Sequence, residues 1–121
     1  MSSDYPYPRE QEDGYEFQVV EQDDADAQGF LAAPLPNDDR RFSVSVGDTV
    51  KLVFLYRDSV EKNGQSISAE HMWVEVIELC ENFLRGRLDS DPQYSSLFNE
   101  GAEVRFHPKH IVNIWEEPAK G

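Results

Sequence analysis

Three histidines are the residues best suited to bind a metal ion. His107 and His110 are spaced as H-x-x-H, and His71 precedes them in the chain. Imidazole nitrogens are good ligands for zinc and nickel, so the three side chains could surround one divalent ion. Pro108, however, lies between the two paired histidines where a strand is expected to end, so their rings need not converge. We therefore expect exposed histidines at the rim of the fold and no bound cofactor.

The remaining polar residues offer little support for catalysis. The pair Glu70-His71 would need a nucleophile or a substrate within hydrogen-bond reach. No serine lies in a nucleophile elbow, and no glycine-rich loop could cradle a phosphate. Cys80 lies close to Glu78 and Glu81, whose charges should raise the pKa of its thiol. We predict that the chain is not an enzyme, with a metal-dependent hydrolase using the three histidines as the rival hypothesis.

Aromatic and acidic side chains are more consistent with a binding surface. If Met72 and Val74 face the core, Trp73 faces outward beside Glu75, which is the composition of an interface anchor with a charged rim. In the alternative, the N-terminal segment covers Trp73 through Phe17 and Phe30. The residues that we expect to bind a partner are Trp73, Glu75, Asp89, Asp91, Tyr94 and the cluster Asp23, Asp24 and Asp26.

The charge of the chain narrows the class of partner. It has 24 acidic and 11 basic side chains, a formal net charge of −13. Nucleic-acid binding depends on cationic side chains, and anionic lipid repels an acidic surface. We therefore predict a protein partner with a basic surface, no direct nucleic-acid binding and no membrane binding. The acidic residues before Phe42 either form a solubilising tail or steer the chain toward that partner.

Short strands separated by turns are the main feature of the rest of the chain. Alternating apolar residues predict strands at the following residues: 49–56, 72–79, 83–88, 103–106 and 112–115, with a briefer one at 16–20. Asn63-Gly64 predicts a tight turn inside a long polar connection, residues 58–69, and Glu81-Asn82 predicts a hairpin turn. Gly86 is expected at a close backbone approach, and a turn of 3-10 helix at residues 109–111.

These elements predict a mainly β protein. Five short strands with one helical turn before the last match a small SH3-like or related antiparallel barrel, whose closure removes exposed strand edges. We assign this barrel to residues 42–117, after an acidic, flexible N-terminal extension (residues 1–41) that can contribute one strand and before a tail, residues 118–121. The alternative is an open antiparallel sheet packed by one helix or by the N-terminal segment.

Four sequence segments together resemble a known bacterial family. They are Glu70-His71-Met72-Trp73-Val74-Glu75-Val76, Phe83-Leu84-Arg85-Gly86-Arg87-Leu88-Asp89-Ser90-Asp91-Pro92, Gly101-Ala102-Glu103-Val104 and Ile111-Val112-Asn113-Ile114-Trp115. The chain resembles, over residues 47–115, the small bacterial proteins grouped as domain of unknown function 2314. It departs from their pattern at Asn113 and Ile114, where members commonly have an acidic residue. The resemblance implies a fold but no activity.

A looser similarity links the chain to bacterial immunity proteins, which neutralise a toxin by binding it. We therefore expect a non-enzymatic inhibitor or regulator, of immunity, antitoxin or anti-defence type, that occludes a basic protein surface. The alternative binding function is mimicry of nucleic acid, in which spaced carboxylates imitate phosphates. A single cysteine, and no signal peptide or membrane-spanning run, predict a cytoplasmic protein. The oligomeric state stays open.

Overall fold

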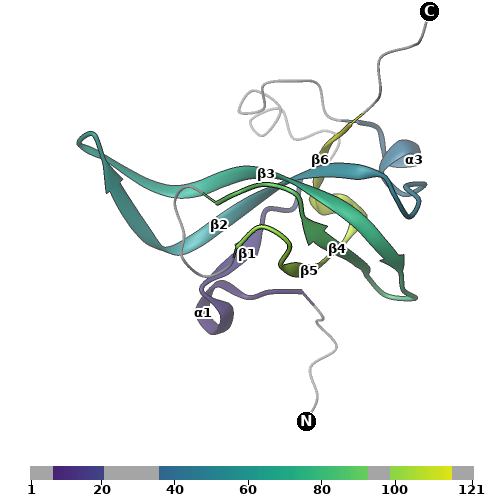
Figure 1. Ribbon diagram of the computed structural model, residues 1–121, viewed down its shortest axis with the longest axis horizontal. Helices are drawn as coiled ribbons and strands as arrows, with labels where there is room; N and C mark the ends of the chain where they lie inside the picture. The colour runs from purple at the N-terminus through teal and green to yellow at the C-terminus, as the bar shows by residue number, and fades with distance from the viewer. Residues whose placement is uncertain (1–6, 21–35, 93–98, 116–121) are drawn as a thin grey trace, which may run out of the picture.

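The computed structural model describes residues 7–20, 36–92 and 99–115 of the chain, and within them strands predominate (Figure 1). The helical elements are α1 (Glu10–Asp13), α3 (Asp38–Arg41) and the 3-10 turn η1 (Pro108–His110). The strands are β1 (Tyr15–Phe17), β2 (Thr49–Lys62), β3 (Gln65–Leu79), β4 (Leu84–Leu88), β5 (Glu103–Phe106) and β6 (Ile111–Ile114). The prediction of a mainly β protein is confirmed.

The strands form one antiparallel sheet that curls strongly into a half-barrel (Figure 1). Strands β1 to β5 lie in sequence order, and β6 pairs with β2. Because β3 occupies one edge of β2, β1 and β6 follow each other along its other edge, at residues 54–56 and 50–52. The described strands therefore make a half-barrel, and the expected closed barrel is not formed, because the path of paired strands ends at β1 and β5.

A single hydrophobic core covers the inner face of the half-barrel. Val50, Leu52, Phe54 and Tyr56 of β2 are buried in it, as their alternation predicted. The other buried members come from the remaining strands and from the segment before β2: Phe17, Val44, Met72, Val74, Val76, Leu84, Leu88, Val104, Phe106, Ile111 and Ile114. A smaller cluster of Val20, Val53 and Val112 lies on the outer face, because Val53 alternates with the core residues of β2.

The distal halves of β2 and β3 project from the body as a two-stranded arm (Figure 1). Asn63 and Gly64 turn the chain with φ values of 53° and 80°, the left-handed conformation of a tight hairpin turn, so the predicted turn is confirmed. The prediction of a long connection between strands at residues 58–69 is wrong, because these residues continue both strands up to the turn. All residues from 57 to 66 are exposed, so no buried face imposes the alternation by which a strand is recognised.

The hairpin of β3 and β4 has the expected register. Leu84, Gly86 and Leu88 are buried, whereas Arg85 and Arg87 lie on the outer face. A Cβ atom on Gly86 would clash with Cγ1 of Val74 and would lie 2.8 Å from Cε1 of Phe106. The predicted close backbone approach at Gly86 is therefore confirmed.

The described parts of the N-terminal region pack against the sheet. The expected strand at residues 16–20 is the shorter β1, after which the amides of Gln18 and Val20 donate to the carbonyls of Val53 and Lys109. Phe17 and Val20 are buried, and β1 is a strand of the kind that the N-terminal extension was expected to be able to contribute. A few apolar contacts and backbone hydrogen bonds hold a segment whose composition is otherwise polar. The domain boundary at residue 42 stays a prediction.

The C-terminal elements lie close to their predicted positions. β5 has the predicted bounds, with Val104 and Phe106 buried. η1 and β6 each begin one residue earlier than expected, because Pro108 begins the 3-10 turn. Within residues 7–20, 36–92 and 99–115, no helix has the length and apolar character needed to cross a membrane.

Candidate functional site

Two tryptophans from distant parts of the sequence meet at the outer surface. The rings of Trp73, on β3, and Trp115, directly after β6, lie edge to face with centroids 5.7 Å apart and an interplanar angle of 90°. The Trp115 amide donates to the carbonyl of Thr49 at 2.8 Å, which fixes its backbone at the end of the sheet. Trp115 is 57% exposed and Trp73 is half-buried. Together they form an aromatic surface accessible to solvent.

Lys51 of β2 contacts one of the two tryptophans, Trp73. It lies opposite Trp73 of β3 on one side and opposite Asn113 of β6 on the other, so β2 lies between the strand that carries Trp73 and the strand that leads to Trp115. Its Nζ is 4.8 Å from the centre of the Trp73 ring, a cation–π contact that favours one orientation of that ring. We call Lys51, Trp73 and Trp115 the tryptophan surface.

Two of the predicted acidic residues flank this surface. The Trp73 amide donates to Oγ of Ser90 at 3.0 Å, and the Asp89 amide donates to the Trp73 carbonyl at 2.9 Å. These two bonds attach the segment after β4 to the backbone of Trp73. Asp89 and Asp91, on either side of Ser90, are exposed. The structure thus brings two solvent-accessible carboxylate residues next to the aromatic pair.

Glu75, the third predicted acidic residue, is paired within the chain. Its Oε1 accepts a hydrogen bond from Nη2 of Arg87 at 2.8 Å. Farther along the same face, Arg85 bridges Glu78 and Glu103, with Nη2 2.8 Å from Oε2 of Glu103. The hydrogen bond and charge of Arg85 lower the pKa of Glu78. These arginines largely neutralise the carboxylates on this part of the outer face.

The other predicted binding residues lie outside the described ranges: Tyr94, Asp23, Asp24 and Asp26. The alternative in which Phe17 covers Trp73 is wrong. Phe17 lies on the inner face, where its ring packs edge to face on Phe54 with centroids 4.7 Å apart. Phe30, which was expected to join it, also lies outside the described residues.

The three histidines do not meet. His71 pairs with Val53 and shares its outer face, because the next residue, Met72, belongs to the inner core. His110 is 2% exposed and contacts Phe17 of the inner core. In the described ranges, no group of three or more His, Cys, Asp or Glu side chains could hold a metal ion. The grouping of histidines that the metal hypothesis requires is not formed.

His107 and His110 instead stabilise the turn that contains them. Nδ1 of His107 accepts from the amide of Lys109 at 3.0 Å, and Nδ1 of His110 accepts from the amide of His107 at 2.9 Å. The rings of Tyr7 and His110 lie edge to face, with their centroids 5.2 Å apart. Burial and, to a lesser extent, His107 lower the pKa of His110 to about 3. His110 is therefore a neutral hydrogen-bond acceptor near neutral pH.

Cys80 has the character expected for an unreactive thiol. It is a free, half-buried cysteine directly after β3. Partial burial and, next, the charge of Glu78 raise the pKa of its thiol. A raised pKa keeps the sulfur protonated, which makes it a poor nucleophile.

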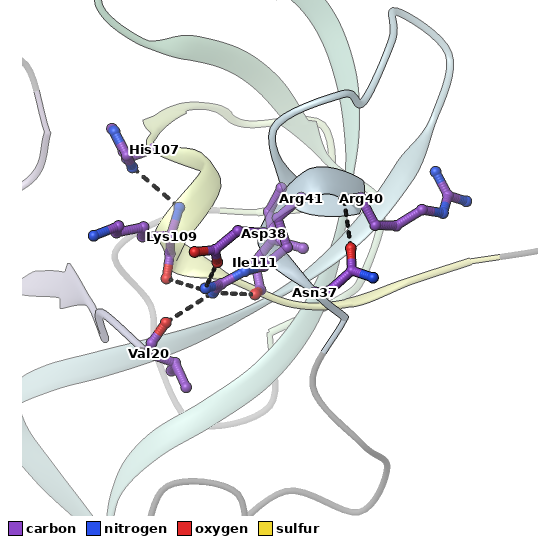
Figure 2. A network of polar contacts seen from close by, with 8 residues as sticks. All are labelled: Val20, Asn37, Asp38, Arg40, Arg41, His107, Lys109 and Ile111. Carbon is purple, nitrogen blue, oxygen red and sulfur yellow. Dashed lines mark hydrogen bonds and ion pairs between the residues drawn. The ribbon is translucent and has the colours of Figure 1, made fainter. Parts of the chain in front are cut away.

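A buried arginine that was not predicted joins three segments (Figure 2). Nη1 of Arg41 donates to the carbonyl oxygens of Val20, Lys109 and Ile111 at 2.8, 3.2 and 3.2 Å, and Nη2 lies 2.6 Å from Oδ1 of Asp38. The side chain is completely buried. Asn37 caps α3 by accepting from the Arg40 amide at 2.8 Å, which orients the helix that carries Arg41. Arg41 directly follows Arg40 in a polar segment, and this pattern does not distinguish a buried arginine from an exposed one.

Comparison with known families gives a match over most of the chain. The model of a family described as an uncharacterized protein conserved in bacteria (DUF2314) matches residues 18–116. This range begins directly after β1 and ends just after Trp115, so it includes both tryptophans and Arg41. No curated protein and no solved structure gives a significant match.

Proposed function

Because the chain belongs to the DUF2314 family of uncharacterized bacterial proteins, the family suggests no function, and we propose from the chain's own surface that it is a non-enzymatic protein-binding module. It would act as an inhibitor or regulator, of immunity, antitoxin or anti-defence type, by covering a basic surface of another protein. The observation that carries this proposal is the edge-to-face pair of half-buried Trp73 and exposed Trp115 at the outer surface.

An exposed tryptophan pair is favourable for binding because its shape is set before the partner arrives. Trp115 is held by its backbone bond to Thr49, and Trp73 by its strand pairing and by Lys51. A surface that is already ordered loses less conformational entropy on association. Tryptophan is among the residues that contribute most to binding free energy in protein interfaces.

Charge supports a basic partner. Asp89 and Asp91 are exposed beside Trp73, and the chain as a whole has a net charge of −13. Because Lys51 already lies over the Trp73 ring, an arginine of the partner could stack on the indole ring of Trp115 while it pairs with one of these carboxylates. Glu75 is bonded to Arg87, so it contributes less to this attraction than Asp89 and Asp91.

Mimicry of nucleic acid has weaker support. A phosphate mimic needs a row of carboxylates with few cations among them. On the outer face of β3, β4 and β5, Arg85 and Arg87 lie between Glu75, Glu78 and Glu103 and bond to them. This alternation of charge favours the protein-binding proposal.

We also propose that the half-barrel is related to SH3-like barrels and that the protein acts in the cytoplasm. The 3-10 turn η1 directly before the last strand supports the first proposal. A single cysteine, which leaves the chain without an internal disulfide, supports the second.

A pull-down from the native host at low salt, with wild type and two variants as bait, tests the proposal. Trp73→Ala removes half of the aromatic pair and should lose the captured partner. Phe42→Ala is the matched control. Phe42 is also exposed and aromatic, but its ring lies against His107 and is not part of the tryptophan surface. Recovery of the same partner by correctly folded Trp73→Ala at undiminished yield would refute the role of this surface.

A further inference from the structure

The arm formed by β2 and β3 is a folded element without a core of its own. The inner core includes Tyr56 at the base of β2 and Met72 on β3, but no residue between them. Tyr56 donates to Oε1 of Glu70 at 2.7 Å and anchors the base of the arm. A two-stranded ribbon alone is at best marginally stable in water. The arm is therefore an element that a partner could stabilise.

The outer edge of β2 along the arm is open in the described part of the chain. β1 pairs with β2 only as far as Tyr56, and the Arg57 amide donates to the carbonyl of Gly14. Beyond that point, β3 is the only described strand that pairs with β2, at Val60, Glu61 and Lys62, and the pairing of β2 with β3 shifts its register between Leu55 and Val60. An edge of this kind can add another strand through backbone hydrogen bonds.

The turn determines which backbone groups face this edge. Lys62 and Gln65 flank the two-residue turn and pair with each other, so the backbone N–H and C=O of Lys62 point toward β3. The direction alternates along a strand, so the backbone groups of Glu61 point outward. Those of Ser59 do so as well, because the Arg57 amide, at the other side of the register shift, also points outward, to Gly14. Two such edges placed antiparallel around Val60 would bring Ser59 of each copy opposite Glu61 of the other, with both pairs hydrogen-bonded.

The charged side chains of two copies would also pair symmetrically. In this arrangement, Asp58 of each copy lies opposite Lys62 of the other, and the two Val60 side chains meet on the axis. The Asp58 side chain is 83% exposed, although Nη2 of Arg57 lies 3.3 Å from it, and Val60 is 38% exposed. Charged groups directly opposite each other across antiparallel strands attract when their signs differ.

We propose that two copies of this chain associate through their arms, with the outer edges of β2 antiparallel about Val60. The net charge of the arm is close to zero along β2, so two copies of this strongly acidic protein can bring their arms together. Between residues 57 and 62, Arg57 and Lys62 balance Asp58 and Glu61, whereas the whole chain has a net charge of −13. The arm therefore lets two copies approach with little local repulsion. The proposal is independent of the tryptophan surface, which lies on the body of the fold.

Reversal of one charge provides the first test, by sedimentation velocity of the full chain over a wide concentration range. Wild type should show a monomer–dimer equilibrium. Asp58→Lys and Lys62→Asp each turn both attractive contacts into repulsive ones, so each should raise the dissociation constant roughly tenfold. Glu100→Lys changes the net charge as much as Asp58→Lys at an exposed turn outside the arm and should leave the dimer intact.

Reconstitution of complementary charge is the sharper test. An equimolar mixture of Asp58→Lys with Lys62→Asp should form a heterodimer, because each variant supplies the charges that the other needs. The double variant Asp58→Lys with Lys62→Asp should dimerise again by itself. Hydrogen exchange should show protection of the Ser59 and Glu61 amides in wild type, and its loss in Asp58→Lys.

Three results would overturn the proposal. One is a wild-type chain that is monomeric at all concentrations at low salt. Another is a dimer that Asp58→Lys leaves unchanged, which would instead indicate pairing through the uncharged edge of β3 at residues 65–69. The last is failure of the mixed variants, both shown to be folded by circular dichroism, to associate.

Discussion

Arg41 shows how one side chain can hold together segments that are far apart in sequence. Its guanidinium donates to carbonyl oxygens of Val20, Lys109 and Ile111, and these belong to the continuation of β1, to η1 and to β6 (Figure 2). Guanidinium suits this task because its donors have a fixed, planar arrangement. The position of β6 beside β2, and with it that of Trp115, depends on this contact.

Replacement of Arg41 by Met should therefore destabilise the fold. The variant keeps much of the side-chain volume but leaves two buried carbonyl groups and one part-buried carbonyl group without this donor, so the free energy of unfolding should fall by about 3 kcal/mol. Urea unfolding measures the change. Arg40→Met, at the exposed neighbouring position of α3, should change it by less than about 0.5 kcal/mol. Equal effects of the two substitutions would contradict the assigned role of Arg41.

His110 should make stability depend on pH. Its pKa is lowered from 6.5 in the unfolded chain to about 3 in the fold. Below pH 6.5 the unfolded chain therefore takes up a proton that the folded chain resists, and stability decreases as the pH falls through this window. At roughly pH 5, the free energy of unfolding should be about 2 kcal/mol lower than at about pH 8.

Urea unfolding at several pH values measures this dependence. His110→Asn keeps an acceptor near the His107 amide but does not titrate in this range, so its pH profile between about pH 5 and 8 should be flatter than that of wild type. If wild type showed no loss of stability over this interval, His110 would not be the buried neutral acceptor described above.

At the level of elements, prediction succeeded where one face of a strand is buried. β4 and β5 and the body of β2 and β3 were recognised because apolar residues alternate along them. The arm was predicted as a loop because neither of its faces contacts the core, so hydrophobic alternation is absent. The two strands of the arm pair because they continue from the body and are joined by the Asn63-Gly64 turn. The sequence pattern predicts only the turn.

The candidate site was predictable only in part, for a related reason. The outward position of Trp73 follows from alternation within one strand. Its contact with Trp115 depends on the pairing of β6 with β2, a tertiary arrangement that no local pattern encodes. Arg41 was missed because a buried arginine and an exposed one look alike in a polar segment.

The β3–β4 hairpin requires glycine at residue 86. A methyl group there would clash with Val74 and approach Phe106, so Gly86→Ala should lower the free energy of unfolding by about 1–3 kcal/mol. Ser66→Ala, at an exposed position of β3, is the matched control and should be close to neutral. Thermal and urea unfolding of both variants measure the difference, and a neutral Gly86→Ala would contradict the close packing of β4 on β3.

For the whole molecule, charge should act mainly on the rate of association. A net charge of −13 attracts a basic partner over distances comparable to the Debye length, so the association rate constant should fall as ionic strength rises. The dissociation rate constant depends on short-range contacts and should change less. Surface plasmon resonance with the captured partner measures both constants. An association rate that is independent of salt would contradict electrostatic steering.

The surface of Trp73 and Trp115 is proposed to bind another protein, and calorimetric titration of the captured partner with Trp115→Ala measures how much this surface contributes. Trp115 is 57% exposed, so its truncation should leave the fold intact. We predict a loss of about 2 kcal/mol in binding free energy, roughly thirtyfold in dissociation constant, as for an interface hot spot. An unchanged dissociation constant for the folded variant would contradict the claim.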